Sequence, residues 1–226
     1  TLLHDRLTPG DTVGLQAPGG IFRLPTSGAL PVVLIAAGVG ITPFLGHLEH
    51  LASCPDAPPV TLYYGSRSGV EHAFRDRLAA LTRAIPSLRR VDVYSRPTDE
   101  DRNTGAFTHK GRITAGTIDA TLIAQRARFY LCGPPDMLRD IAAGLVARGV
   151  PAFDIFQEVF RSPPDTSAVA PDRPRQVRFA RSGRELTWTG GDGTLLDWAE
   201  KNGLTMPSGC RVGQCESCAV PVVSGE

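Results

Sequence analysis

The middle of the chain alternates short apolar runs with stretches in which apolar residues recur every three or four positions. A continuous apolar run of about five residues is typical of a strand buried on both faces, and the periodic stretches are typical of helices that cover a sheet. Residues 31–160 are therefore expected to form βαβ units around a parallel sheet, an α/β fold. The predicted strands are Val32–Ala36, Val60–Tyr64, Val91–Tyr94 and Arg128–Leu131.

Helices are predicted after the first, second and fourth of these strands. At the start of the first helix, Thr42 is expected to be the N-cap and Pro43 to take the first helical position, which suits its fixed φ. Side chains three and four residues apart share one face of a helix, so the apolar positions should face the sheet. Those positions are Phe44, Leu45, Leu48 and Leu51; Phe74, Leu78 and Leu81; and Leu138, Ile141, Ala142 and Leu145.

The segments before and after this region have a different pattern. Residues 1–30 contain turn signals at Pro9-Gly10-Asp11 and Pro18-Gly19-Gly20, with weak alternation over Thr12–Gln16, and are expected to form short strands. Residues 161–175 contain four prolines and almost no large apolar side chains. Such a composition predicts an extended, semi-rigid linker.

Residues 176–226 begin with the pattern of a β-hairpin. Val177 and Phe179 alternate on one arm and Leu186 and Trp188 on the other, with a turn at Ser182-Gly183 between them. A short helix is predicted near Thr194–Asn202, ending at Gly203, because glycine readily takes the left-handed conformation that closes a helix.

Composition and charge narrow the function classes. The 226 residues are 42% hydrophobic and 21% charged, which is ordinary for a globular protein. A net charge of +1 gives no field that would attract nucleic acid or an anionic membrane surface. The longest apolar run, Val32–Ala37, is too short to span a bilayer, and no secretory signal opens the sequence. We therefore expect a cytoplasmic protein without nucleic-acid or membrane partners.

Three cysteines near the C-terminus, Cys210, Cys215 and Cys218, have the spacing C-x4-C-x2-C. This is the spacing of the first three ligands in a plant-type [2Fe–2S] loop, and Gly209 and Gly213 would let the backbone wrap closely around the cluster. The fourth thiolate is expected downstream of Glu226. A zinc site would call for a second Cys/His pair, and a disulfide for an oxidising compartment. A zinc-loaded or metal-free interaction module remains an alternative for this segment.

Glycine and small or basic residues cluster where the predicted strands end. Gly38 and Gly40 follow the first strand, Gly65–Ser68 the second, Ser95-Arg96-Pro97 the third and Cys132-Gly133-Pro134 the fourth. Ligands of open α/β sheets bind outside the carboxyl ends of the strands, and glycines at a helix mouth let a diphosphate approach backbone N–H groups. A tight turn would also explain the glycines, and the arginines could be solvated loop charges.

Several of these motifs occur together in one known family. They are Leu3-His4-Asp5 with Pro9-Gly10-Asp11, Ala17–Phe22, Ala37–Pro43, Tyr94–Pro97, Leu131–Pro134, Glu158–Phe160 and the cysteine loop. In this order they resemble the ferredoxin–NADP reductase superfamily, specifically the flavin–nicotinamide–[2Fe–2S] branch that includes phthalate dioxygenase reductase. The first two segments are also similar to the reductase part of flavohaemoglobins.

The resemblance implies a domain order. Residues 1–30 would be the C-terminal remnant of an antiparallel flavin-binding β-barrel, residues 31–160 an NAD(P)-binding domain, and residues 176–226 a partial β-grasp ferredoxin domain of plant type. The family's flavin motifs, Arg-x-Tyr-Ser/Thr and Gly-x-x-Ser, precede the Leu-His-Asp stretch. Because Thr1 lies just beyond both, the chain is expected to be a fragment, with most of its FAD- or FMN-binding motifs outside it.

The resemblance also implies residue roles. The turn after the first strand would receive the pyrophosphate and ribose of NAD(P)H, and the ends of the second and third strands would receive the adenosine. The end of the fourth strand would lie beside the nicotinamide, and Glu158 and Phe160 would lie at the flavin edge. Cys132 could instead be an ordinary buried cysteine, and Phe160 ordinary packing. In that order the residues are Gly38, Val39, Gly40, Thr42 and Pro43; Arg67, Ser95 and Arg96; Cys132, Gly133 and Pro134; and Glu158 and Phe160.

The implied activity is an electron relay from NAD(P)H through flavin to the [2Fe–2S] cluster, and on to a redox partner such as an oxygenase component. The cofactors supply this chemistry, so no side chain is expected to act as an acid, base or nucleophile. Two alternatives are direct reduction of a diffusible acceptor and a C-terminal module without electron transfer. The choice between NADH and NADPH stays open, although Arg67 and Arg96 could pair with a 2′-phosphate.

Overall fold

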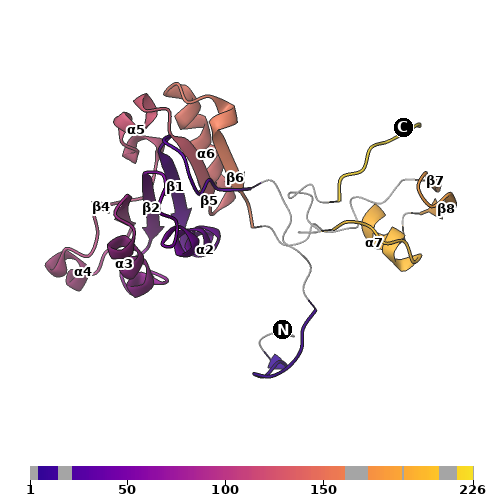
Figure 1. Cartoon of the computed structure of the whole chain (residues 1–226), viewed down its shortest axis with the longest axis horizontal. Helices are drawn as coiled ribbons and strands as arrows, with labels where there is room; N and C mark the ends of the chain where they lie inside the picture. Colours follow the sequence, from indigo (N-terminus) through magenta and orange to yellow (C-terminus); the bar gives the residue numbers. More distant parts are fainter. Residues whose placement is uncertain (1–4, 15–21, 161–172, 190, 209–217, 226) are drawn as a thin grey trace. The chain divides into compact units, whose positions relative to one another are not determined.

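The computed structural model describes residues 5–14, 22–160, 173–189, 191–208 and 218–225. The chain divides into two compact units, residues 22–164 and residues 1–21 together with 165–226. Each unit is described by itself below. Figure 1 traces both along the sequence.

The larger unit is built on a parallel sheet of six strands in the order β4-β3-β2-β1-β5-β6. This confirms the α/β prediction. The four expected strands are present, and β1, β2, β3 and β5 extend slightly beyond their predicted bounds. The strands are β1 Val32–Ala37, β2 Val60–Ser66, β3 Leu88–Tyr94, β4 His109–Lys110, β5 Arg128–Cys132 and β6 Ile155–Glu158.

Helices cover both faces of this sheet (Figure 1). The α-helices are α2 Thr42–Leu51, α3 Arg75–Ala84, α4 Asp99–Thr104, α5 Ala120–Ala124 and α6 Pro135–Ala147, and the 3₁₀ turns are η1 Gly38–Ile41, η2 Ala115–Thr117 and η3 Ala152–Asp154.

Strand β1 shows why the central strands read as unbroken apolar runs. Val32 and Leu34 pack with α2 and α3 on one face, whereas Val33 and Ile35 pack with α5 and α6 on the other. All four side chains are at most 1% exposed. Fully burying one such side chain stabilises the fold by about 1.5–3 kcal/mol, so the hydrophobic pattern fixes which strands are central.

Two helix starts differ from the sequence predictions. Thr42 is the first residue of α2 and not its N-cap, because η1 leads directly into the helix and leaves no extended residue at the junction. The Thr42 hydroxyl donates to the Val39 carbonyl at 3.0 Å. Phe74 is the residue before α3, with a left-handed φ of 57° and 47% exposure, so it does not share the buried face of Leu78 and Leu81.

The N-terminal segments contain no strand in the described residues 5–14 and 22–31. The expected strand at Thr12–Gln16 is absent over its described part, residues 12–14, where Val13 is 48% exposed and gains nothing from extended pairing. The predicted turn is present: the Asp11 amide donates to the Thr8 carbonyl at 3.1 Å. The Phe22 ring packs against the sheet core, 5.7 Å from the ring of Tyr130.

The C-terminal segment forms the predicted hairpin and helix. Strands β7 Arg175–Phe179 and β8 Arg184–Trp188 pair antiparallel with Val177 opposite Leu186, and α7 Leu195–Lys201 follows. Gly203 closes α7 with φ of 73°. The Trp198 ring is 3% exposed and lies 5.8 Å from Phe179 and 6.4 Å from Trp188. Strand β7 begins within the predicted linker, at its last residue.

In the part of the chain that the structure describes, no helix combines the length and the apolar character needed to cross a bilayer.

Candidate cofactor-binding site

The strand order places a topological switch point at β1. From β1 the chain proceeds outward through β2 and β3 to β4, and then returns to place β5 on the opposite side of β1. Strands β1 and β5 are therefore neighbours, but the turn after β1 runs to one face of the sheet and the turn after β5 runs to the other face. In open α/β sheets this point at the carboxyl edge is where ligands bind.

Backbone packing at this point requires glycine. A Cβ atom on Gly40 would lie 2.1 Å from the Cys132 carbonyl oxygen and 2.8 Å from the Gly133 amide nitrogen. Real Cβ atoms do not approach so closely, so the turn after β1 and the turn after β5 contact each other through bare backbone. Gly38 also has a φ of +54°, which glycine adopts without the steric cost of a side chain.

The same turn leaves its backbone open to a ligand. Gly38 is exposed and Val39 is 67% exposed. Neither η1 nor α2 has a side-chain cap on its first turn. The first amides of a helix lack intrahelical partners and favour an anion. Because η1 runs into α2, those amides lie at the start of η1: the Thr42 amide already donates to the Val39 carbonyl, and Pro43 has no N–H. The exposed glycine turn therefore fits the pyrophosphate of a dinucleotide.

The ends of β2 and β3 bring the predicted adenosine-binding residues together. The Ser95 amide donates to the Ser66 carbonyl at 3.1 Å, and the Arg96 amide donates to the Arg67 carbonyl at 2.7 Å. Both arginine side chains are exposed. The Arg67 guanidinium lies 3.4 Å from the Glu71 carboxylate, and an ion pair so exposed contributes little and leaves Arg67 able to exchange partners.

The predicted nicotinamide and flavin positions meet at the ends of β5 and β6. Cys132 and Glu158 are direct neighbours in the strand register. Cys132 is fully buried, and burial, with a smaller contribution from the Glu158 charge, raises the pKa of its thiol to about 12. A neutral thiol is a poor nucleophile, which agrees with a binding role. Burial also raises the pKa of the Glu158 carboxyl. Phe160, two residues beyond β6, is 47% exposed.

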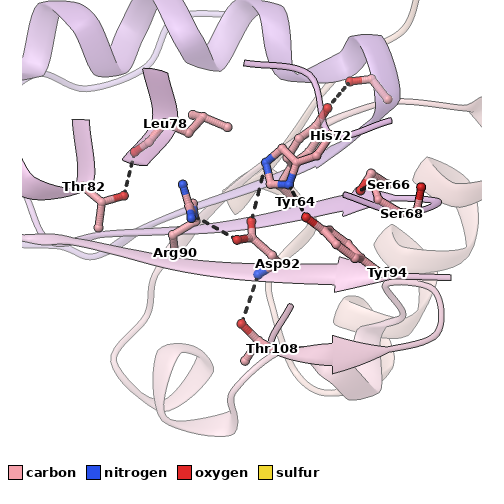
Figure 2. Close-up of polar contacts among 11 residues, drawn as sticks. Tyr64, Ser66, Ser68, His72, Leu78, Thr82, Arg90, Asp92, Tyr94 and Thr108 are labelled. Atoms are coloured by element: carbon pink, nitrogen blue, oxygen red, sulfur yellow. Dashed lines mark hydrogen bonds and ion pairs between the residues drawn. The ribbon is translucent and has the colours of Figure 1, made fainter. Parts of the chain in front are cut away.

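A buried polar cluster beneath this edge was not predicted from the sequence (Figure 2). The His72 Nδ1 atom lies 2.7 Å from the Tyr94 hydroxyl, and the Arg90 Nε atom lies 3.0 Å from an oxygen of the Asp92 carboxylate. Burial, assisted by Arg90 and Arg75, lowers the pKa of His72 to about 4, so the imidazole is neutral near pH 7. The sequence signal for this cluster was Asp92, an aspartate inside a predicted apolar strand.

Tyr64 joins this cluster to the glycine turn. Its hydroxyl donates to the Gly38 carbonyl at 3.2 Å, and its ring lies edge-on to the His72 imidazole with centroids 4.8 Å apart. Sequence analysis missed Tyr64 because its partner lies 26 residues away and becomes a neighbour only through the β1–β2 register.

The predicted metal ligands are only partly within the described structure. Cys210 and Cys215 lie outside the described residues. Cys218 is half-buried and forms no disulfide, so its sulfur is available as a ligand. Three thiolates with this spacing fit an iron–sulfur cluster. Among the residues that the structure describes, no group of three or more His, Cys, Asp or Glu side chains could hold a metal.

Comparison with known families assigns both parts of the chain. Residues 34–143 match the oxidoreductase NAD-binding domain, and residues 177–226 match the 2Fe–2S iron–sulfur cluster binding domain. The first match contains both turns that meet at the switch point. The second contains the cysteine loop and the hairpin from Val177 onward.

Curated relatives match the same region. The flavohemoproteins of Deinococcus radiodurans and Bordetella pertussis are 37% and 32% identical to this chain over 158 residues, which is 70% of this chain and 39% of each relative. The chain thus spans about two fifths of the length of these relatives.

Solved structures agree. The flavohem-like FAD/NAD binding domain of nitric oxide dioxygenase from Vibrio cholerae is 32% identical with a TM-score of 0.55, covering 70% of this chain and 62% of that one. A flavohemoglobin from Malassezia yamatoensis with bound FAD and heme is 27% identical with a TM-score of 0.51, covering 62% of this chain and 33% of that one.

An NAD-binding domain followed by a 2Fe–2S domain defines a class of oxidoreductase. In sequence and fold the chain is similar to flavin- and NAD-binding reductases of the ferredoxin–NADP reductase type.

Proposed function

We propose that the chain is the nucleotide- and cluster-binding part of a flavin-dependent NAD(P)H oxidoreductase that delivers electrons to an oxygenase component or another redox protein. The observation that carries this proposal is the backbone contact between Gly40 and the Cys132 carbonyl at the switch point, in a chain that also carries a 2Fe–2S domain. When bound, the cofactors supply hydride transfer from NAD(P)H to flavin and single-electron transfer through the cluster.

The residues of the chain bind and orient. The exposed amides at Gly38 and Val39 and the first turn of α2, with Thr42 and Pro43, would hold the pyrophosphate and ribose. Arg67, Ser95 and Arg96 would hold the adenosine end. Cys132, whose buried thiol is uncharged, would lie with Gly133 and Pro134 beside the nicotinamide, and Glu158 and Phe160 would lie at the flavin edge. The cluster ligands would be Cys210, Cys215 and Cys218.

The predicted domain division is part of the proposal: a flavin-barrel remnant at 1–30, the NAD(P)-binding domain at 31–160, a linker at 161–175 and a partial ferredoxin domain at 176–226. The flavin is inferred from relatives whose names include FAD. The protein partner is inferred from the branch of the superfamily.

The proposal is tested on the full-length parent protein with Cys215→Ser. Reduction of a protein acceptor such as cytochrome c by NAD(P)H should fall at least tenfold, whereas reduction of the small dye ferricyanide, which can take electrons from flavin, should persist. Iron–sulfur absorption should be lost from the visible spectrum. Unchanged cytochrome reduction would show direct transfer to diffusible acceptors, and a wild-type protein that binds zinc without visible absorption would show an interaction module.

Nucleotide preference is tested separately with Arg96→Ala. If Arg96 pairs with a 2′-phosphate, the KM for NADPH should rise while that for NADH stays unchanged. An equal rise for both donors would place Arg96 on a part of the adenosine that the two share.

A further inference from the structure

Two adjacent tyrosines on β2 each hold a distant backbone group. Tyr63 and Tyr64 are 2% and 0% exposed and pack into the two opposite cores of the sheet. The Tyr63 hydroxyl accepts from the Asp119 amide at 3.1 Å, and the Tyr64 hydroxyl donates to the Gly38 carbonyl at 3.2 Å. The two bonds are alike in length and burial but support different loops.

We propose that Tyr64 is a positioning residue for the nucleotide, holding the Gly38–Gly40 turn in the orientation that presents its amides to the pyrophosphate. The inference rests on the proposed function, because it assigns that turn to the dinucleotide. Tyr64 itself does not contact the ligand.

The Gly40 end of the turn is packed against the Cys132 carbonyl and lies within η1, so support from Tyr64 matters at the Gly38 end. Gly38 has no side chain, is exposed and adopts a positive φ, and the Val39 side chain is 67% exposed. A peptide plane with these neighbours can rotate readily, which would turn the Gly38 carbonyl toward the ligand and away from Tyr64. A fixed donor on the carbonyl opposes that rotation, and the cost of ordering the turn is then met before binding.

The donor is itself held rigidly (Figure 2). The Tyr64 ring packs edge-on against His72 at 4.8 Å, and the His72 Nδ1 atom is fixed at 2.7 Å from the Tyr94 hydroxyl. Burial raises the pKa of the Tyr64 hydroxyl, which keeps it protonated, and the hydroxyl also accepts a backbone hydrogen bond from Ala73. Tyr94 directly precedes Ser95, so the cluster supports both predicted ends of the dinucleotide site.

The test compares Tyr64→Phe with Tyr63→Phe in the full-length holoprotein. Each variant removes one hydroxyl: Tyr63→Phe leaves the Asp119 amide without that acceptor, and Tyr64→Phe leaves the Gly38 carbonyl without that donor and the Ala73 amide without that acceptor. Both should lose thermal stability, Tyr64→Phe somewhat more. Dissociation constants for NAD⁺ and NADP⁺ are measured by isothermal titration calorimetry. Tyr64→Phe should weaken binding of the preferred nucleotide by about 3- to 10-fold, the equivalent of one hydrogen bond, while Tyr63→Phe should change it less than twofold.

Equal affinities in wild type and Tyr64→Phe, or an equal loss in both variants, would overturn the inference. If wild type binds neither nucleotide, the proposed function itself fails, so the two failures are distinct. Should Tyr64→Phe not fold, replacement of Tyr64 by para-aminophenylalanine keeps a donor at the same place. Affinity within twofold of wild type then supports the inference, and a tenfold loss overturns it.

Discussion

The sheet unit and the C-terminal hairpin unit stabilise themselves in different ways. The sheet unit buries both faces of its central strands under helices, in two separate apolar cores. In the described part of the C-terminal unit, the buried apolar residues are Trp198 and its neighbour Ala199. Many buried side chains therefore stabilise the sheet unit, whereas the described part of the C-terminal unit depends mainly on the Trp198 indole.

The difference predicts which of the two units depends on a bound ligand for its stability. The glycine turn after β1 rests on an apolar core that is complete without a ligand. A domain of about 50 residues buries a smaller share of its surface and commonly needs a metal or disulfide for independent stability. Residues 177–226 match a domain that binds a cluster, and metal binding at such sites couples to folding.

The largest expected effect is that of Trp198→Ala. Truncating a buried aromatic residue costs about 3–5 kcal/mol, which is comparable to the whole stability of a small domain. We expect the C-terminal unit to unfold at 25 °C while the sheet unit stays folded. Both tryptophans of the chain, Trp188 and Trp198, lie in the C-terminal unit, so fluorescence of the remaining Trp188 reports that unit, and far-UV circular dichroism mainly reports the sheet unit.

Leu204→Ala is the matched control, since Leu204 is only half-buried just beyond α7 and should cost less. A native-like Trp188 emission spectrum in Trp198→Ala, with an unchanged fluorescence midpoint, would show that the C-terminal unit does not depend on this indole.

A smaller loss, confined to the sheet unit, is expected from Gly40→Ala. The new Cβ atom would lie 2.1 Å from the Cys132 carbonyl oxygen, so the turn and β5 must separate. Such overpacking costs about 1–3 kcal/mol. Nucleotide affinity should fall at least tenfold, because the displaced turn carries the amides that we propose bind the pyrophosphate. The checks are thermal unfolding by circular dichroism and calorimetric titration with NAD⁺ and NADP⁺.

Gly46→Ala provides the control within α2, where an added Cβ meets nothing within 4 Å. It should stabilise the helix by about 0.5–1 kcal/mol and leave nucleotide affinity unchanged. If Gly40→Ala behaves like Gly46→Ala, the close contact between the two turns is not a requirement of the fold.

The comparison also explains which features could be predicted from the sequence. The central strands were predicted because burial on both faces leaves a continuous apolar run, as in β1. Strand β4 has two residues, both exposed, and β6 ends in polar residues, so neither has an apolar signal. The hairpin was predicted because Val177 and Leu186 alternate with exposed residues around a glycine turn.

The candidate site also contains residues that could be predicted from the sequence and residues that could not. Arg67, Ser95 and Arg96 could be grouped from sequence, since parallel strands end at a common edge, and backbone hydrogen bonds join them there. The contact of Tyr64 with Gly38 could not be predicted, because it depends on the register between strands and on the turn that follows β1.

The larger effect of pH on stability should appear in the sheet unit. Burial holds His72 neutral with a pKa of about 4, below its ordinary 6.5, so the unfolded chain takes up a proton first as pH falls. Stability is therefore complete above pH 6.5 and is lost as pH falls toward about 4, at up to about 1.4 kcal/mol per pH unit for one group. We expect a net loss of about 1–2 kcal/mol, because Asp92, whose pKa is raised by burial, opposes it.

His72→Gln should flatten this pH dependence, and the measurement is denaturant unfolding followed by circular dichroism between pH 7 and 4.5. His47 on α2, whose pKa burial also lowers to about 4, accounts for a remaining slope in the variant. Residues 161–226 contain no histidine, so the fluorescence transition is the internal control. An identical slope in wild type and His72→Gln would contradict the burial of a neutral imidazole.

The smallest expected effect compares one capping device in both units. Thr98 caps α4 by accepting from the Asp101 amide at 3.1 Å, and Thr194 caps α7 by accepting from the Asp197 amide at 3.1 Å. Replacing either threonine with alanine costs about 1 kcal/mol. That cost lowers the melting temperature by about 4–8 °C in a domain of 60–100 residues and by about 2–4 °C in one of 150–250 residues. Thr194→Ala should therefore lower the fluorescence midpoint more than Thr98→Ala lowers the circular dichroism midpoint. Equal shifts in both signals for both variants would mean that the two units unfold as one, and the contrast between them would then describe packing but not stability.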